Sequence, residues 1–357
     1  MFTSLKGSLY NFPSCLLFGW LIILLPQSAS SQAVLTLAKD EEYFSPGRYL
    51  YILEDKIGKL TREEVNRLPL TAFRLSKEDE PNIGFSSSVY WVKFFVFNMV
   101  PDTEWLLEYR YPPMDSITLY SGLNSTNKVQ QAGDSLPFSE RPIPHRNHVF
   151  KLEPKPGQIT AFLLRFKSDS SVVFPLRIWQ KDAFIAADAM TNLLIGGFLM
   201  LLLVMIVYNI PIYITTREKA YIPYNLFILV NFFFQLQMTG VGAMYLWPTS
   251  SWWSNQSLLI FSSLSVTFSM IFTIVFLQTK QWIPLIHRFL LVLLVLTSVN
   301  SLLSPFIPYS ISIRITNFLL IILSTIFIFI AIFVYIKGYL PARYYLIAWS
   351  VLLVAVF

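Results

Sequence analysis

From about residue 189 onward, the chain consists of long apolar stretches that almost lack charge. The first five contain about 20 residues or more, which is the length an α-helix needs to cross the hydrocarbon core of a bilayer. The sixth has 14 residues before the sequence stops. We place the stretches at roughly 190–213, 222–247, 255–277, 289–308, 315–336 and 344–357. The pattern predicts an α-helical transmembrane bundle in 189–357, with five full spans and part of a sixth, truncated in its sixth helix.

The charges divide the chain at the same place. Residues 1–188 contain 20 Lys and Arg and 20 Asp and Glu, whereas residues 189–357 contain seven Lys and Arg and a single acid, Glu218. Six of those seven basic residues lie in the three loops at 214–221, 278–288 and 337–343. Basic loops face the cytoplasm in multi-span proteins. The positive excess therefore reports membrane orientation, and it argues against a nucleic-acid partner.

The N-terminus has the pattern of an export signal. Lys6 precedes an eleven-residue apolar core at 15–25, and small residues follow at 28–31. Such a core is short for a span and typical of a signal peptide, which we place at 1–31; the alternative is an uncleaved anchor. The only cysteine, Cys15, lies within it. The mature chain would then have no disulfide, no Cys-ligated metal and no Cys nucleophile.

Residues 34–183 have the alternation of a β domain. Apolar and polar residues alternate in 104–111, 162–167 and 174–179, as in strands with one buried face. The stretch 90–97 is apolar on both faces except at Lys93, which predicts a central strand, and only 61–68 has a helical pattern. We therefore expect an extracytoplasmic all-β sandwich, jelly-roll-like, ahead of the helical bundle.

No catalytic motif stands out in this sequence, which contains no GxSxG, HExxH, Walker loop or GxGxxG. His145 and His148 would point to opposite faces of a strand-rich loop, which disfavours a shared metal. The acidic pair Glu63 and Glu64 fits a solvated helix surface better than acid–base chemistry. We expect no enzyme activity, no cofactor and no metal in this chain.

The interiors of the apolar stretches contain Asn and Gln but no Asp, Glu or Lys. Pumps and proton-coupled transporters usually need an ionisable group at depth, so we interpret these amides as interhelical hydrogen-bonding groups rather than an ion path. They are Asn192, Asn209, Asn225, Asn231, Gln235, Gln237, Asn300 and Asn317. Gly196-Gly197 and Gly240-Val241-Gly242 predict close helix contacts.

A series of short motifs resembles the bacterial seven-transmembrane receptors with diverse intracellular signalling modules (7TMR-DISM), with their type 2 extracellular domain. In the first domain the motifs are Tyr51-Ile52-Leu53-Glu54-Asp55, Asn82-Ile83-Gly84-Phe85-Ser86, Tyr90-Trp91, Asn98, Tyr111-Pro112-Pro113-Met114-Asp115, Leu119-Tyr120, Gly133-Asp134, Arg141, His145-Arg146, Arg165, Pro175-Leu176 and Trp179. In the apolar half they are Gly196-Gly197, Tyr208-Asn209, Tyr221, Tyr224, Arg343-Tyr344-Tyr345 and Ala348-Trp349. The resemblance covers roughly 45–357.

The resemblance implies a periplasmic sensor domain similar to carbohydrate-binding modules, seven spans in the bacterial inner membrane and a variable cytoplasmic output module. Structural roles are available for several of these motif residues: positive φ at Gly84 and Gly133, core packing at Trp91 and Trp179, and turn hydrogen bonds at Asp134. For ligand binding we select aromatic and planar hydrogen-bonding side chains, which suit sugars. These are Trp91, Arg110, Asp115, Tyr120, Arg141 and Arg146.

The function most consistent with these features is a sensory receptor. It would bind a small-molecule or carbohydrate ligand outside the cytoplasm and relay the signal through the bundle to an output module. Its partners would be the lipid bilayer, the ligand and a second copy in a homodimer. The alternatives are a transporter or channel with an accessory periplasmic domain and a membrane-tethered carbohydrate-active enzyme, for which no separated catalytic carboxyl pair is evident.

Overall fold

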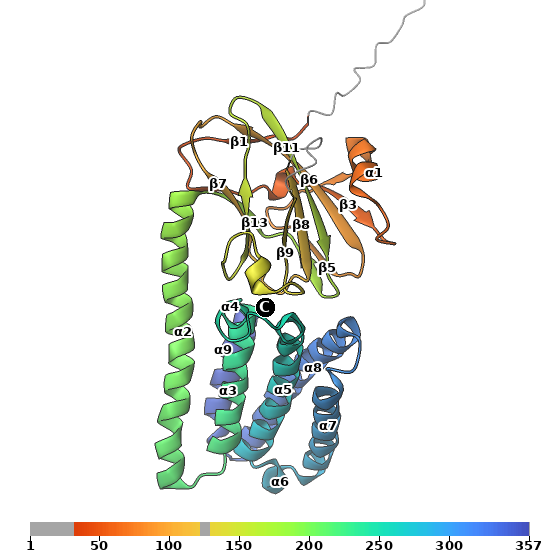
Figure 1. Cartoon of the computed structure of the whole chain (residues 1–357). Coiled ribbons are helices and arrows are strands. Elements are labelled where there is room, and N and C mark those ends of the chain that lie inside the picture. Colours follow the sequence, from red (N-terminus) through yellow and green to blue (C-terminus); the bar gives the residue numbers. More distant parts are fainter. Residues whose placement is uncertain (1–31, 122–128, 357) are drawn as a thin grey trace, which may run out of the picture. The chain divides into compact units, whose positions relative to one another are not determined.

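The structure is a computed structural model that describes residues 32–121 and 129–356, with side chains up to residue 350. Within them, a β-rich domain comes first and a helical part follows (Figure 1). This order confirms the predicted fold class of a β-sandwich ahead of a helical transmembrane bundle. The predicted signal peptide, 1–31, lies outside the described residues.

The larger sheet of the described domain has the strand order β4-β3-β6-β11-β8-β9, with β1 parallel to β6. β6 pairs with β3 on one side and β11 on the other, which confirms the central strand predicted at 90–97. The strands are β1 Leu35–Leu37, β3 Tyr51–Asp55, β4 Arg74–Leu75, β6 Val89–Asn98, β8 Ser116–Ser121, β9 Val129–Ala132 and β11 Ile159–Lys167.

The smaller sheet has the order β10-β7-β13-β2, and β5 pairs with β12 separately. These strands are β2 Tyr43–Phe44, β5 Asn82–Phe85, β7 Trp105–Tyr109, β10 His148–Leu152, β12 Ser171–Val173 and β13 Leu176–Gln180. Three short 3₁₀ turns accompany the sheets, at Gly47–Tyr49 (η1), Leu70–Ala72 (η2) and Phe138–Glu140 (η3). The helix predicted at 61–68 is α1, Arg62–Arg67, and Thr61 and Glu64 close a capping box at its start.

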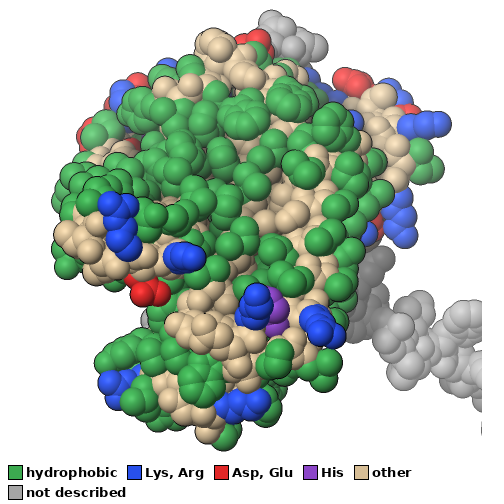
Figure 2. Space-filling model, turned by 90° about the horizontal axis from the view of Figure 1, so that it is seen from below, with side chains coloured by type: hydrophobic (Ala, Val, Ile, Leu, Met, Phe, Trp, Pro, Cys, Tyr) green, Lys and Arg blue, Asp and Glu red, His purple; other side chains and the backbone are tan. Residues whose placement is uncertain are grey.

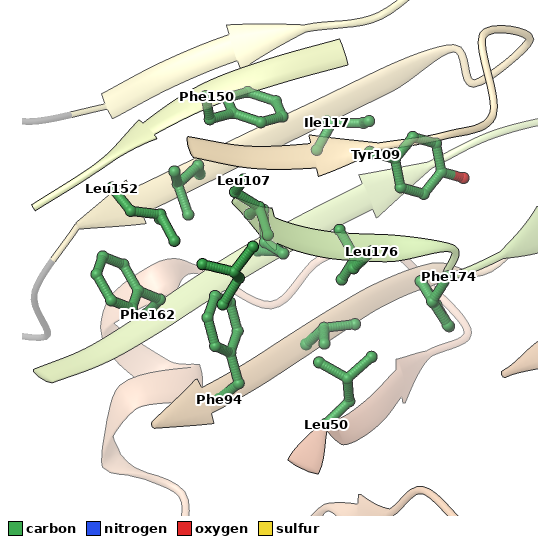
Figure 3. Packing of buried hydrophobic residues seen from close by; sticks show 14 of the residues in the cluster. Leu50, Phe94, Leu107, Tyr109, Ile117, Phe150, Leu152, Phe162, Phe174 and Leu176 are labelled. Atoms are coloured by element: carbon green, nitrogen blue, oxygen red, sulfur yellow. The ribbon is translucent and has the colours of Figure 1, made fainter. Parts of the chain in front are cut away.

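The core of the domain lies between the two sheets. Figure 3 shows Phe94 and Phe162 of the larger sheet pointing toward Leu107 of the smaller one. Alternation along β7 places Leu107 and Tyr109 in this core, so that Glu108 and Arg110 lie on the opposite face of the smaller sheet. That outward face carries the polar groups of the candidate site described below.

A second apolar layer covers the outer face of the larger sheet. Trp91 lies there with Val65 of α1 and Phe73, because its side chain points away from the face used by Tyr90 and Val92. Trp91 is 1% exposed. The predicted core role of Trp91 is therefore confirmed.

Four helices in the described residues are long and apolar enough to cross a membrane: α2, α5, α7 and α8. The apolar stretch predicted at 222–247 is divided, because Gly240 adopts a positive φ of 77° between α3 and α4. The helices are α2 Lys181–Thr216, α3 Tyr221–Met238, α4 Val241–Tyr245, α5 Ser251–Phe276, α6 Thr279–Trp282, α7 Pro284–Leu303, α8 Tyr309–Ile336 and α9 Ala342–Val356.

Polar side chains connect the helices, as their placement in apolar stretches predicted. Side-chain hydrogen bonds join α5 to three other helices. Asn231 Nδ2 of α3 donates to Ser265 Oγ (3.0 Å). The hydroxyls of Thr267 and Ser301 join α5 to α7 (3.0 Å), and those of Thr273 and Tyr345 join α5 to α9 (2.6 Å). Asn300 Nδ2 donates to Thr316 Oγ1 between α7 and α8 (3.1 Å). The amides Asn231 and Asn300 therefore have the interhelical role expected of them.

The two glycine motifs have different outcomes. A Cβ built on Gly196 or Gly197 would meet no atom within 4 Å in the described structure, so the predicted helix contact at this pair is wrong. At Gly242 a Cβ would lie 2.6 Å from the Trp247 ring, and at Gly240 it would lie 2.3 Å from Arg146 O. The second motif therefore allows close packing, and part of that packing is against the β domain.

Figure 2 shows the end of the helical part that is lowest in Figure 1. Lys and Arg side chains are scattered there among hydrophobic ones, with little acidic surface. Exposed basic residues of the three loops singled out in the sequence are Arg217, Lys219, Lys280, Arg288, Lys337 and Arg343. The cytoplasmic location of these loops stays a prediction from the charge bias.

Candidate functional site at the junction of sandwich and helices

Helix α2 continues directly from the last strand of the sandwich. β13 ends at Gln180, and α2 begins at Lys181. Lys181 N donates to the carbonyl of Glu104, the residue just before β7 (3.1 Å). The segment 181–188 thus forms the first two turns of a 36-residue helix. At 1.5 Å per residue, α2 is about 54 Å long, well above the roughly 30 Å of a hydrocarbon core. Part of α2 must therefore lie outside the membrane.

A cavity of about 270 Å³ lies where α2 and α3 approach the smaller sheet. The sandwich contributes Glu108, Arg110 and Arg177 to its lining, while α2 contributes Asp188 and Thr191. Thr239, at the end of α3, completes this side of the cavity. Side chains of both parts of the chain can therefore contact one occupant.

A buried polar network joins the loop before β10 to α2. Arg146 Nη2 donates to Asp188 Oδ1 (3.2 Å) and Arg146 Nε to Asn192 Oδ1 (2.9 Å). His145 Nε2 lies 2.9 Å from the same Asp188 oxygen. Asn147 N donates to His145 Nδ1 (3.1 Å). Asn192 Nδ2 donates to Asp188 Oδ2 (2.7 Å), so both carboxylate oxygens have partners.

Glu108 is the second acid of the cavity, and it is 4% exposed. Asn147 Nδ2 donates to its Oε1 (2.6 Å), and Trp179 Nε1 donates to its Oε2 (2.9 Å). Each oxygen of this buried carboxyl group thus has a hydrogen-bond donor, as buried polar groups require.

Arg110 and Arg177 share the outward face of the smaller sheet with Glu108. Arg177 lies directly across from Glu108 in the β7–β13 register, and Arg110 follows two residues after Glu108. Arg110 Nη1 is 4.0 Å from Glu80 Oε1, at the outer limit of an ion pair. The guanidinium of Arg177 lies over Tyr43, 4.4 Å from the ring centroid.

Next to the cavity, two carboxyl groups of the sandwich contact α5. Asn255 Nδ2 donates to Asp115 Oδ1 (2.7 Å) and lies 3.4 Å from Asp134 Oδ1. Burial, with the nearby charge of Asp115 as the second cause, raises the pKa of Asp134 to about 8. Burial also raises the pKa of Asp115. At neutral pH the pair therefore retains a proton, because two adjacent buried carboxylates repel each other.

The loop from β9 to β10 is held against the helices by backbone contacts as well. Arg141 Nη1 donates to the carbonyls of His145 (2.8 Å) and Arg146 (3.2 Å). Burial lowers the pKa of Arg141 to about 10, which leaves the guanidinium charged at neutral pH. Phe138 N donates to Pro248 O in the segment between α4 and α5 (2.9 Å). The close approach of Gly240 to Arg146 O, described above, adds a contact with the end of α3.

The structure brings two of the six residues selected from sequence to the cavity, Arg110 and Arg146. Asp115 contacts Asn255 of α5, and Arg141 donates to the carbonyls of His145 and Arg146 in its own loop. Trp91 and Tyr120 stack on each other with centroids 6.1 Å apart, on the outer face of the larger sheet. They do not reach the cavity, because they project from the other sheet.

Other motif residues have structural roles. Gly133 and Gly84 adopt positive φ, as predicted, and a Cβ on Gly133 would lie 2.0 Å from Asp115 O. Trp179 is 5% exposed, which confirms its predicted burial. The carboxyl of Asp134 faces Asn255 and Asp115 rather than the turn amides expected for it. Burial lowers the pKa of His148 to about 3, and its Nε2 lies 3.0 Å from Pro112 O.

Sequence reasoning missed several residues of the junction. Asp188 and Asn192 are spaced i, i+4 at the start of α2, a pattern that places them on one helix face and was available as a signal. Arg177 was visible on the polar face of its strand. The contact of Asn255 with Asp115, 140 residues away in the chain, has no local signal.

The lining of the cavity combines polar side chains with apolar ones. Among the described residues, no three His, Cys, Asp or Glu side chains gather in a way that could hold a metal ion. The cavity instead offers charged, hydroxyl and amide groups beside the buried rings of Trp179 and Phe184. Small-molecule sites typically combine such orienting polar groups with apolar walls.

Comparison with known protein families gives two matches. A model described as 7TMR-DISM extracellular 2 matches residues 47–180. A second model, described as 7TM diverse intracellular signalling, matches residues 191–357. No curated protein matches the chain. The first match contains the cavity residues of the sandwich and the second contains Thr191 and Thr239, whereas Phe184, Ala187 and Asp188 lie between the two matched regions.

Proposed function

Because the chain belongs to the family of seven-transmembrane receptors with diverse intracellular signalling modules, we propose that it senses a small extracytoplasmic molecule and relays its presence to a cytoplasmic output module. The ligand occupies the cavity between the smaller sheet and helices α2 and α3. Carbohydrates are among the candidate ligands, as the family resemblance implies. The β domain faces the periplasm, and the basic loops face the cytoplasm.

The observation that supports this proposal is the mixed lining of the cavity. Arg110 and Arg177 come from the sandwich, Asp188 and Thr191 from α2, and Thr239 from the end of α3. A ligand in contact with both groups has a different binding energy in each relative arrangement of sheet and helices. Such a difference is the requirement for a ligand to shift a conformational equilibrium.

The direct continuation of β13 into α2 provides the path of transmission. A flexible linker would absorb a displacement of the sheet, whereas a continuous helix transmits it along its axis. The buried contact of Arg146 with Asp188 adds a second connection at the same level. Movement at the cavity would therefore reach the inner end of α2.

The test measures distances at the inner end of the helices in the full chain. Spin labels are placed at Lys219→Cys and Lys280→Cys, both exposed, in a Cys15→Ser background. A saturating ligand, found by a thermal-shift screen of sugars and small organic acids, is expected to shift the distance distribution between the labels. The variant Asp188→Asn should reduce the shift.

The matched control is Glu104→Gln, which removes an exposed ion pair with Lys181. Exposed pairs contribute little, so the ligand-induced shift should persist in this variant. A ligand that binds the β domain and leaves the distances between the two spin labels unchanged would contradict the proposal. Ligand flux into vesicles that is lost on replacing Asn231 or Gln235 would favour the transporter instead.

A further inference from the structure

The two acids that line the cavity already accept hydrogen bonds from protein groups. Both oxygens of Glu108 accept hydrogen bonds from Asn147 and Trp179. Both oxygens of Asp188 are occupied as well, by Arg146 and Asn192. Each carboxylate therefore already has hydrogen-bond donors from the protein itself.

The cationic groups on the sheet side are in the opposite situation. The nearest carboxylate oxygen to Arg110 is that of Glu80, at 4.0 Å, and the Arg110 side chain is 38% exposed. Arg177 is held by Tyr43 and Trp179 through ring contacts, with centroids at 4.4 and 5.8 Å, and forms no ion pair within the described residues. Two guanidinium groups with unused N–H donors therefore line one cavity whose acids are already satisfied.

The strand register explains why these two groups lie together. Arg177 lies opposite Glu108 in the pairing of β13 with β7. Two residues further along the chains, Arg110 N donates to Pro175 O (3.1 Å). Arg110 and Arg177 are therefore diagonal neighbours on one face of the sheet, within reach of a common partner. The stacking of Arg177 on Tyr43 fixes the plane of its guanidinium without consuming its donors.

We propose that the cavity recognises a small organic molecule bearing an oxyanion, a carboxylate or a phosphate ester, through Arg110 and Arg177. This inference rests on the proposed function and specifies the ligand class of the same site. Guanidinium groups bind carboxylates and phosphates through paired, charge-assisted hydrogen bonds. The volume of about 270 Å³ is at the lower limit of small-molecule sites, which admits a sugar acid or a hydroxy acid rather than a glycan chain.

The experiment uses the full chain in detergent and probes that differ only in the anionic group. Galacturonate is compared with galactose, glucose 6-phosphate is compared with glucose, and succinate and citrate complete the set. Binding is measured by isothermal titration calorimetry at low and high salt. At least one anion is expected to bind more tightly than its neutral counterpart and to weaken as salt rises.

The variants Arg110→Gln and Arg177→Gln should each weaken binding of that anion by about tenfold to a hundredfold, as expected for a lost hydrogen bond to a charged group. The control is Arg165→Gln, which also lies over an aromatic ring, Trp91, but on the larger sheet. The affinity of this control variant for the anion should equal that of the original chain. Thermal melting of each variant checks that the fold is retained.

Three results would overturn the assignment: neutral sugars bind as tightly as their acids, none of the anions binds, or an anion binds equally well to the double variant Arg110→Gln/Arg177→Gln. The receptor function would survive the first of these results, because a neutral ligand in the same cavity can still shift the helices. Conversely, an anion that binds through these arginines without changing the distance between the labels leaves the inference intact and contradicts the receptor function.

Discussion

Replacing Asp134 by Asn tests the carboxyl pair that joins the sandwich to α5. Burial and the neighbouring Asp115 raise the pKa of Asp134 from 3.8 to about 8. A carboxyl whose pKa is higher in the folded than in the unfolded state binds more protons when folded. The stability of the protein should therefore fall as the pH rises through the window from about 4 to about 8. Asn cannot ionise, so Asp134→Asn removes this part of the pH dependence.

The size of the effect follows from the pKa difference. Each unit corresponds to about 1.4 kcal/mol, so a difference of about four units sets an upper limit of roughly 6 kcal/mol between the two ends of the window. The positive charge of Arg141 acts in the opposite direction, and the pKa of about 8 already includes its effect. The other titratable groups that face the pair are Asp169, Tyr109, Tyr111 and Tyr309. We expect a loss of a few kcal/mol in the original chain.

The assay is the melting temperature of the full chain in detergent between pH 5 and pH 9. The original chain and Asp134→Asn should melt at similar temperatures near pH 5, and the variant should melt higher at pH 9. Asp79→Asn is the control, because Asp79 forms an exposed ion pair with Arg48 and is 62% exposed. Parallel pH profiles for the original chain and Asp134→Asn would refute the reasoning, since the carboxyl would then not titrate in this window.

Three further predictions concern the junction and the topology. Arg146→Gln leaves Asp188 without its buried cation and should lower the free energy of unfolding by about 3 kcal/mol, measured by melting. Adding Asp188→Asn to this variant should restore part of the lost stability. Losses in the double variant that simply add up would contradict the coupling between the two residues. Gly240→Ala places a methyl group against the carbonyl of Arg146, at a position whose φ is 77°. The variant should lose about 1–3 kcal/mol of folding stability, and proteolysis of its β domain should be faster. An unchanged rate of proteolysis would be inconsistent with this contact. Reporter fusions should place the β domain and the loop at Arg217 on opposite sides of the membrane, and the same side for both would contradict the orientation.

The local pattern of the sequence predicted several of the elements. Alternation at 162–167 predicted part of β11, and the apolar run at 90–97 predicted a central strand, because side chains alternate between the faces of a strand. The apolar stretch at 222–247 was predicted as one span, but it breaks at Gly240. Two glycines close together in an apolar run are compatible both with close helix packing and with a turn at positive φ, so the sequence alone does not distinguish the two.

The site depended on contacts that local pattern does not encode. Arg110 and Arg146 were selected for their chemistry, and the fold brings both to the cavity. Trp91 was selected for the same chemical reason but faces the layer under α1. β6 is apolar on both faces, so its sequence could not show which face would be covered by the second sheet and which by α1. Asn255 was grouped with the membrane half, although its partner is Asp115 of the sandwich.

The segment between β9 and β10 connects these separate contacts into one mechanical unit. Along fewer than fifteen residues it contacts α5 through Asp134, the segment before α5 through Phe138, and both α2 and the end of α3 through Arg146. Arg141 ties its two ends together, since its Nη1 bonds the carbonyl of Arg146 while its charge acts on Asp134. Arg146 also lines the cavity. A ligand that displaces Arg146 therefore cannot act on α2 alone, because the same backbone carries the contacts with α3 and α5.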